Sequence, residues 1–229
     1  SSFFLKKKSH ILLSILAIEG IAFYTFDTPQ FNVNICQIPL WIGTVYFFFK
    51  SIKDNKITDW IFLGVFAALG FLTKYIFVYL LISLFFYLIF ILTKKKRINF
   101  KFLYALLIFF LITAPHFKWL IQNDFTTLYY ALKRGGLNEF NIYNHLLNPI
   151  KFLINQITIL LPFLLLIYFL IKKIKIRLPL NNEKFIFLLF SFLLPFLLIL
   201  ITSIITGSRI RTMWMIPFYS LIGIFFIFL

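Results

Sequence analysis

Long apolar runs dominate the sequence, and their length limits what the chain can fold into. The runs are bounded by charged residues or proline and cover residues 11–26, 33–49, 60–92, 102–120, 152–171, 185–205 and 213–229. An α-helix rises about 1.5 Å per residue and the hydrocarbon layer is about 30 Å thick, so about 20 apolar residues make one membrane span. With 62% hydrophobic and only 13% charged residues, a water-soluble domain could not bury this much apolar surface. The sequence therefore predicts an all-α, polytopic transmembrane helix bundle of about eight helices.

The run from Trp60 to Leu92 is too long for one span and short for two. As a single helix it would extend about 50 Å, well beyond the hydrocarbon layer. Its only charged residue is Lys74, and a lysine at the centre of a spanning helix costs about 2.5 kcal/mol or more. We therefore expect two short helices with a turn at Lys74, which leaves a notch at the membrane surface. The functional interpretation is a binding site in this notch, and the alternative is a lysine that reaches the headgroup phosphates.

The positive residues are divided unevenly between alternate loops. Sixteen of the 23 Lys and Arg residues fall in the segments 6–8, 50–56, 94–101 and 172–184, and seven fall on the opposite side. Loops rich in Lys and Arg stay on the cytoplasmic side of a membrane, so the first set is predicted to be cytoplasmic. The net charge of +16 is then mainly an orientation signal with some attraction to anionic lipid, and nucleic-acid binding is not expected.

The outer side collects most of the polar residues that could form a site. Asn32, Asn34 and Gln37 open one helix and lie along one side of it, where they either join helices together or line a polar cavity. The segment 122–150 is only partly apolar, and we expect short helices at the outer membrane interface there. Residues 1–229 are interpreted as one transmembrane domain, central or C-terminal in a longer protein, because the chain opens on Ser1 in a basic loop.

Motifs of soluble enzymes are not visible. The sequence has no Cys/His metal spacing, no glycine-rich phosphate loop and no Ser/His/Asp arrangement, and its three histidines are far apart. No cofactor is expected, and nothing in the sequence supplies a carboxylate cluster for a metal ion. The single cysteine, Cys36, allows no intrachain disulfide.

Three groups of residues together resemble a known family. They are Phe31-Asn32-Val33-Asn34 through Pro39-Leu40-Trp41, then Asp59-Trp60 with Gly64 through Lys74-Tyr75, and then Ala114-Pro115-His116-Phe117-Lys118-Trp119-Leu120 with Asn123-Asp124-Phe125-Thr126-Thr127-Leu128-Tyr129-Tyr130-Ala131. In order and spacing, over about residues 20–220, they look like the bacterial dolichyl-phosphate-mannose-protein mannosyltransferase-like group. Its members are GT-C glycosyltransferases, similar to those that decorate lipopolysaccharide cores and lipid A.

The resemblance implies transfer of a sugar from a polyprenyl-phosphate donor to a lipid, glycan or protein acceptor, by inverting displacement at the anomeric carbon. It places the enzyme in the bacterial inner (cytoplasmic) membrane, with the active site facing the periplasm or exterior. Such a reaction needs cations that hold the charge developing on the leaving phosphate and a carboxylate that takes the acceptor proton.

Carried over residue by residue, the resemblance places Lys74 on the donor phosphate and implies that Arg209 or Arg211 assists. The family has a second acidic residue at the position that Gln30 occupies in this sequence. Asp27 lies three residues earlier and is therefore the candidate catalytic carboxylate. The family's general base lies in an earlier outer loop, which would precede Ser1. The residues expected to line the cavity are Asn32, Asn34, Gln37, His116, Trp119 and Asp124.

Two other functions are compatible with the sequence. A transporter or lipid flippase would also have polar residues in short helices, although no inverted repeat is visible. A non-catalytic membrane partner would explain why the base motif is missing. Substrate flux in proteoliposomes would indicate the first, and sugar transfer that does not need Lys74 would indicate the second.

Overall fold

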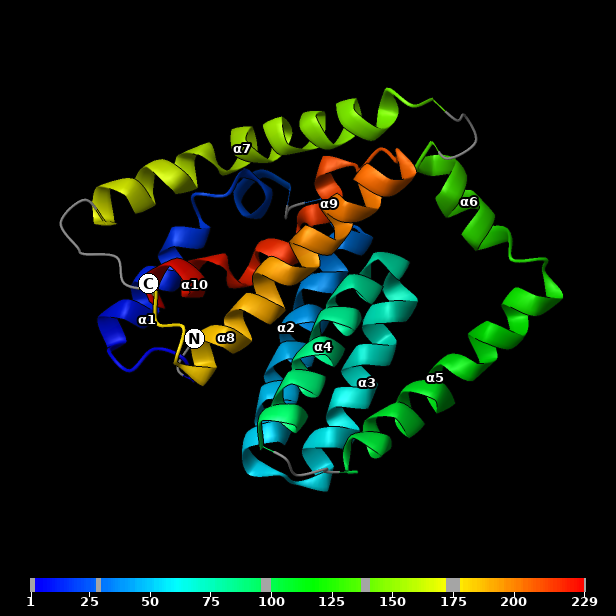
Figure 1. Ribbon diagram of the computed structural model, residues 1–229, viewed down its shortest axis with the longest axis horizontal. Helices are drawn as coiled ribbons and strands as arrows, with labels where there is room; N and C mark the ends of the chain where they lie inside the picture. The colour runs from blue at the N-terminus through cyan, green and yellow to red at the C-terminus, as the bar shows by residue number, and fades with distance from the viewer. Residues whose placement is uncertain (1–2, 28–29, 96–99, 137–140, 172–177, 229) are drawn as a thin grey trace.

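The computed structural model describes residues 3–27, 30–95, 100–136, 141–171 and 178–228, and every regular element in them is helical (Figure 1). The α-helices are α1 (Lys8–Ile18), α2 (Val33–Asp54), α3 (Ile57–Thr73), α4 (Val78–Lys95), α5 (Phe102–Gln122), α6 (Thr126–Arg134), α7 (Asn144–Ile171), α8 (Glu183–Leu188), α9 (Leu194–Thr206) and α10 (Ile222–Phe228). The 3-10 and π-helical turns are η1 (Phe23–Asp27), η2 (Tyr75–Phe77), η3 (Leu189–Leu193), η4 (Thr212–Met215) and η5 (Pro217–Leu221).

The helices have the length and composition of a membrane protein. In the described residues, 5 helical stretches are long and apolar enough to cross a membrane, and three shorter apolar stretches accompany them. These long and short stretches correspond to the about eight helices that the sequence predicts. The prediction of an all-α membrane bundle is confirmed, and the chain is an integral membrane protein.

α3 packs between α2 and α5. The turn at the end of α3, which contains Lys74, belongs to the candidate site described below. At Gly64 a Cβ atom would lie 2.6 Å from the carbonyl oxygen of Ala105 and 2.8 Å from Cβ of Ile108. Only glycine fits there, because the two backbones approach more closely than any side chain allows. Small residues at such crossings are typical of membrane bundles, where packing rather than water exclusion holds helices together.

The core beneath the site is aromatic. The buried ring of Trp41 on α2 lies edge-on to Phe77, with centroids 5.5 Å apart, and contacts Phe218 of η5 at 4.6 Å. Aromatic pairs in this range add favourable geometry to the area they bury. α2, the α3–α4 turn and η5 near the C-terminal end of the described chain therefore pack on one core.

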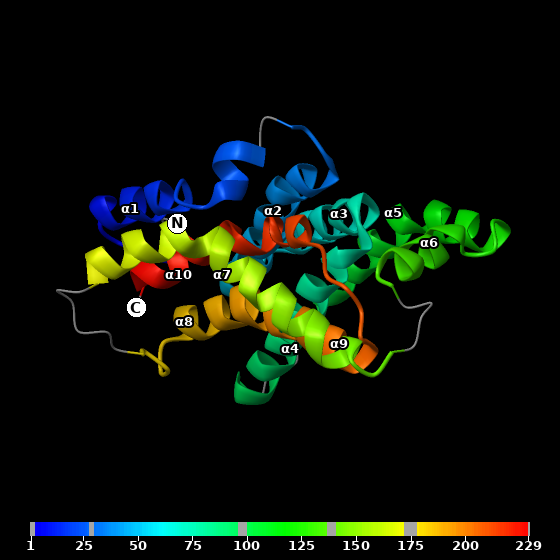
Figure 2. The ribbon, with the colours of Figure 1, turned by 90° about the horizontal axis from the view of Figure 1, so that it is seen from above.

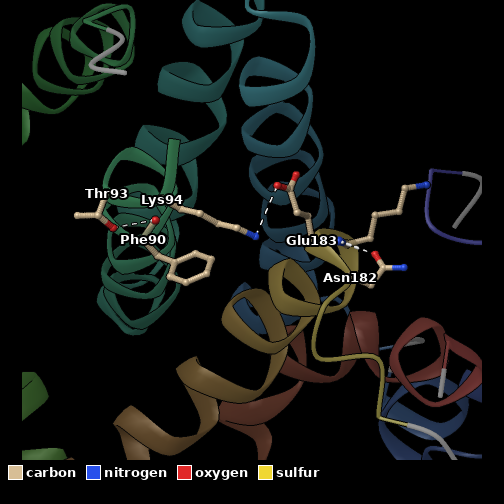
Figure 3. Close-up of polar contacts among 6 residues, drawn as sticks. Phe90, Thr93, Lys94, Asn182 and Glu183 are labelled. Carbon is tan, nitrogen blue, oxygen red and sulfur yellow. Dashed lines mark hydrogen bonds and ion pairs between the residues drawn. The ribbon is translucent and has the colours of Figure 1, made fainter. Parts of the chain in front are cut away.

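The loops rich in Lys and Arg meet at one end of the bundle, which we call the basic end. Lys94 at the end of α4 and Glu183 at the start of α8 point toward each other, with 3.8 Å between Nζ and Oε1 (Figure 3). Nζ of Lys101, directly before α5, donates to the carbonyl oxygen of Asn55 at 2.8 Å, which joins the start of α5 to the loop between α2 and α3. The described residues of these predicted cytoplasmic segments therefore share one end, and the assignment of that end to the cytoplasm remains a prediction.

Two helix boundaries differ from the apolar runs. The first run does not form one helix, because α1 ends at Ile18 and the chain turns at Glu19 and Gly20 before η1. A Cβ at Gly20 would lie 3.0 Å from Cα of Phe163 on α7, so close contact with α7 sets this turn. α7 begins at Asn144, inside the segment predicted to lie at the interface.

α5 packs on α3, and its C-terminal end points away from α4. Figures 1 and 2 show α6 leading back from that end toward the C-terminal end of α9. The backbone N–H of Arg209, in the loop after α9, donates to the carbonyl oxygen of Gly135 at 2.8 Å. This bond joins the end of α6 to the loop after α9, opposite the basic end.

Candidate active site

The turn between α3 and α4 is built around Lys74. α3 ends at Thr73, and Lys74 takes an extended conformation with φ −167° and ψ 134° before η2 begins. Nε2 of Gln37 on α2 donates to the carbonyl oxygens of Lys74 at 3.0 Å and Gly70 at 3.4 Å. Carbonyl groups in the last turn of a helix lack intrahelical partners, so this buried amide supports the turn. The predicted break at Lys74 is confirmed.

The side chain of Lys74 is held by an amide oxygen and an aromatic face. Asn32 caps α2, because its Oδ1 accepts from the backbone N–H of Asn34 at 2.9 Å and from Nδ2 of Asn34 at 3.1 Å. Oδ1 of Asn34 is then free to accept from Nζ of Lys74 at 2.6 Å. Nζ of Lys74 also lies 4.8 Å from the ring centroid of Trp214, a cation–π arrangement.

The charge of Lys74 has no carboxylate partner among the described residues. Burial lowers the pKa of Lys74 to about 7, and the positive charges of Arg134 and Arg211 contribute to the shift. All of these effects disfavour the ammonium form. A negative group that enters beside Lys74 would favour the ammonium form again. The surroundings of Lys74 therefore have the electrostatic character of an anion-binding site.

On the other side of the turn, the hydroxyl group of Tyr75 lies between two polar side chains. Its oxygen is 2.8 Å from Nε2 of His116 on α5 and 2.7 Å from Oγ1 of Thr127 on α6. A phenol can donate one hydrogen bond and accept another, so Tyr75 can satisfy both contacts. It joins the α3–α4 turn to α5 and α6.

These groups line a cavity of about 760 Å³, which we call the Lys74 cavity. Its volume lies in the range of small-molecule sites. Its walls come from α2, the α3–α4 turn, the start of α4, α5, α6, α9 and the loop after α9, and its main polar groups belong to Asn32, Asn34, Lys74, Tyr75, His116 and Arg134. Among the described residues, the lining includes cations and no carboxylate.

The Lys74 cavity lies in a part of the chain with known relatives. A family model described as dolichyl-phosphate-mannose-protein mannosyltransferase matches residues 3–119, just over half of the chain. The chain belongs to this family. No curated protein and no solved structure matches the chain. Membership makes it a membrane glycosyltransferase of the GT-C type, with mannosyltransferase-like activity.

The mannosyltransferase match covers only part of the cavity wall. It runs from the segment before α1 to near the end of α5 and includes Asn34, Lys74 and His116. Thr127 and Arg134 on α6, and Trp214 after α9, lie outside the matched range. The fold brings these later residues into the wall of the same cavity as Lys74.

Arg209 and Arg211 lie in a different depression of this mannosyltransferase. Both line a second cavity of about 420 Å³, between the start of α7 and the loop after α9, which we call the Arg209 cavity. Ile210 and Met213 line both cavities, so the two adjoin. The charge of Arg211 still contributes to the lowered pKa of Lys74, although its side chain forms the wall of the neighbouring cavity.

The remaining predicted site residues are dispersed around the Lys74 cavity. Gln37 is fully buried behind the wall, where its amide supports the turn. Trp119 stacks on His116, with ring centroids 6.1 Å apart, and Asp124 lies in the turn between α5 and α6 with φ 49°. None of these three is among the described residues that line the cavity. The backbone of Asp27 ends η1, and its side chain lies outside the described ones.

Sequence reasoning missed several residues of the cavity, notably Tyr75, Arg134 and Trp214. A signal for Arg134 exists in α6, where Thr127, Tyr130, Ala131 and Arg134 recur at helical spacing and all line the cavity. Such i, i+3, i+4, i+7 positions share one helix face. Trp214 has no comparable signal, because only the return of the chain after α9 brings it to Lys74.

Proposed function

We propose that this protein transfers a sugar from a polyprenyl-phosphate donor to a lipid, glycan or protein acceptor, in the Lys74 cavity on the outer face of the bacterial cytoplasmic membrane. The observation that carries the proposal is the half-buried ammonium group of Lys74, which faces a ligand-sized cavity without a carboxylate among its described lining residues. A buried cation of this kind needs an anionic partner. The donor phosphate supplies one.

The two ends of the donor suit different parts of the wall. The phosphate oxygens would accept from Lys74 and from Arg134, which lines the cavity on α6 and is held by a bond from Nη1 to the hydroxyl oxygen of Tyr130 at 2.6 Å. Val33, Leu72 and Val78 add apolar, partly exposed surface at the same cavity. A polyprenyl chain can leave along this surface toward the hydrocarbon layer.

Displacement at the anomeric carbon moves negative charge onto the leaving phosphate. An acceptor oxygen forms the new bond to the anomeric carbon, the bond to the phosphate oxygen breaks, and its electron pair stays with the lipid phosphate. Lys74 and Arg134 would stabilise this charge as it develops, which is the largest single contribution in many enzymes. The acceptor proton goes to a carboxylate outside the described lining, and Asp27 is the candidate in this chain.

Sugar transfer in membranes containing the full-length gene product tests the proposal. Radiolabelled sugar on a polyprenyl phosphate is supplied, and Lys74→Ala is compared with wild type at equal expression. Loss of a preorganised cation should lower the rate roughly 100-fold. Lys118→Ala is the matched control, because this exposed lysine of α5 lies outside both cavities and its loss should change little.

Each outcome has a definite meaning. Transfer that needs Lys74 and tolerates loss of Lys118 supports the donor-phosphate role. Equal transfer by wild type and Lys74→Ala would remove Lys74 from the reaction. Absence of transfer by wild type with several sugar donors would contradict the proposed donor and acceptor chemistry.

A further inference from the structure

The Arg209 cavity has the composition of an anion-binding site. It is lined by Lys151 of α7 and by Arg209 and Arg211 of the loop after α9, and the amides of Asn148 and Asn155 and the hydroxyl of Thr212 add to its polar lining. No carboxylate is found among the described residues of its wall. Guanidinium groups and amides are the donors that proteins use for phosphate and carboxylate oxygens.

The positive charges of this cavity are not neutralised within the described part of the chain. The ion pairs in the described part of the chain are Lys50–Asp59 and Lys94–Glu183. Both lie at the basic end, away from this cavity. Like charges that share a cavity repel one another, and because Lys151, Arg209 and Arg211 are all exposed, water and salt screen part of this repulsion. An anion bound between them would relieve this repulsion.

The walls of the cavity are joined by hydrogen bonds, so its shape exists without a ligand. Nδ2 of Asn148 donates to the carbonyl oxygen of Gly207 at 2.7 Å. Nδ1 of His145 lies 2.9 Å from the carbonyl oxygen of Ile204. The backbone bond from Arg209 to Gly135 adds α6 to the same junction. A preformed site loses less entropy on binding than one that must be ordered.

The position beside the Lys74 cavity indicates which substrate carries the anion. Ile210 and Met213 separate the two cavities and line both. A polyprenyl-phosphate sugar has a single phosphate, and the proposed function uses it at Lys74. A second group of cations next to the transferred sugar therefore suits the second substrate.

We propose that the Arg209 cavity binds an anionic group, a phosphate or a carboxylate, of the sugar acceptor. The inference rests on the proposed function. It changes the expectation for Arg209 and Arg211, which the sequence resemblance assigned to the donor phosphate. Phosphate from bulk phospholipid offers the same chemistry from another source, and the experiment separates the two.

Binding to the full-length protein in phosphatidylcholine nanodiscs tests the site directly. Short-chain phosphatidic acid, which carries a phosphate monoester, is titrated while a polyprenyl phosphate saturates the Lys74 cavity. Arg209→Gln/Arg211→Gln should bind it roughly tenfold more weakly, because two charge-assisted contacts are lost. Lys118→Gln/Lys133→Gln is the matched control, since it removes equal charge from residues outside both cavities and should bind like wild type. Equal weakening in both variants would overturn the site.

Transfer kinetics identify the source of the anion. Arg209→Gln/Arg211→Gln should raise the KM for the membrane acceptor without raising the KM for the donor, and phosphatidic acid should compete with the acceptor alone. If phosphatidylglycerol in the nanodisc displaces phosphatidic acid and the acceptor KM of the variant stays normal, the site belongs to bulk lipid and the proposal is wrong. If wild type transfers no sugar although phosphatidic acid binding still needs Arg209 and Arg211, the proposed function and the acceptor assignment fail while the anion site stands.

Discussion

Nζ of Lys74 donates to Oδ1 of Asn34 at 2.6 Å, and this bond joins two residues 40 positions apart in the sequence. Asn34 belongs to the first turn of α2, whereas Lys74 follows the last turn of α3. The same asparagine donates to the capping side chain of Asn32, so its amide orientation is set from both sides. The cation is thereby aimed into the cavity without being neutralised.

Asn34→Ala should weaken donor binding more than it slows the chemical step. The ammonium loses its positioning partner, and a hydrogen bond to a charged group contributes about 1.5 kcal/mol or more, so the donor KM should rise roughly tenfold. Asn34→Asp should be worse, because a carboxylate would pair with Lys74 and repel the phosphate. Steady-state kinetics with varied donor check this, and an aspartate variant as active as wild type would contradict it.

Donor affinity should depend on pH through Lys74. Its pKa in the empty cavity is lowered to about 7, so the charged form is present below that pH and is lost as pH rises above it. A sugar phosphodiester does not titrate in this range. The donor dissociation constant should therefore rise between about pH 6 and about pH 9. Arg134→Gln removes one repulsive charge and should move the rise to higher pH, whereas Lys74→Arg should flatten the profile.

Tyr75→Phe should loosen α6. The phenylalanine cannot make the contacts at 2.8 Å to His116 and 2.7 Å to Thr127, and each lost hydrogen bond costs about 1 kcal/mol. Hydrogen exchange in residues 126–134 should become faster, because α6 has no buried residue to hold it. Tyr129→Phe is the control, since Tyr129 is 67% exposed. Equal exchange in the two variants would show that Tyr75 does not hold this helix.

Substitutions at Gly64 should destabilise the bundle in order of side-chain size. A Cβ there would approach the carbonyl oxygen of Ala105 to 2.6 Å, so α3 and α5 must separate. Overpacking of this kind costs about 1–3 kcal/mol. Thermal unfolding of the full-length protein in detergent should show a falling midpoint from alanine to valine to leucine. Ala114→Leu, on the exposed side of α5, is the control and should unfold at the same temperature as wild type. An unchanged unfolding midpoint for Gly64→Leu would contradict the prediction.

The helical content and the position of the main turn were predictable because both depend on local properties. A run of apolar residues in lipid has to form a helix to satisfy its backbone hydrogen bonds. Lys74 marked the break within 60–92 because a charge inside a spanning helix is costly. The motif that includes Lys74 also predicted the family, and the match over residues 3–119 confirms it.

Local patterns did not predict the end of α1 at Ile18 or the start of α7 at Asn144. Apolar residues follow Gly20, so hydropathy shows no boundary. The turn depends instead on close contact of Gly20 with Phe163 of α7. Contacts between segments far apart in the sequence leave no periodic signal along the chain.

By itself, the sequence determined that the chain is an integral membrane helix bundle, that it turns at Lys74, and that it belongs to a mannosyltransferase family. Only the tertiary structure decided which groups surround Lys74, namely Asn34, Trp214 and Arg134 from separate elements. It also decided that Arg209 and Arg211 line a separate cavity. The physical reason is that hydropathy and charge act on each segment locally, whereas side-chain packing between helices determines which faces meet.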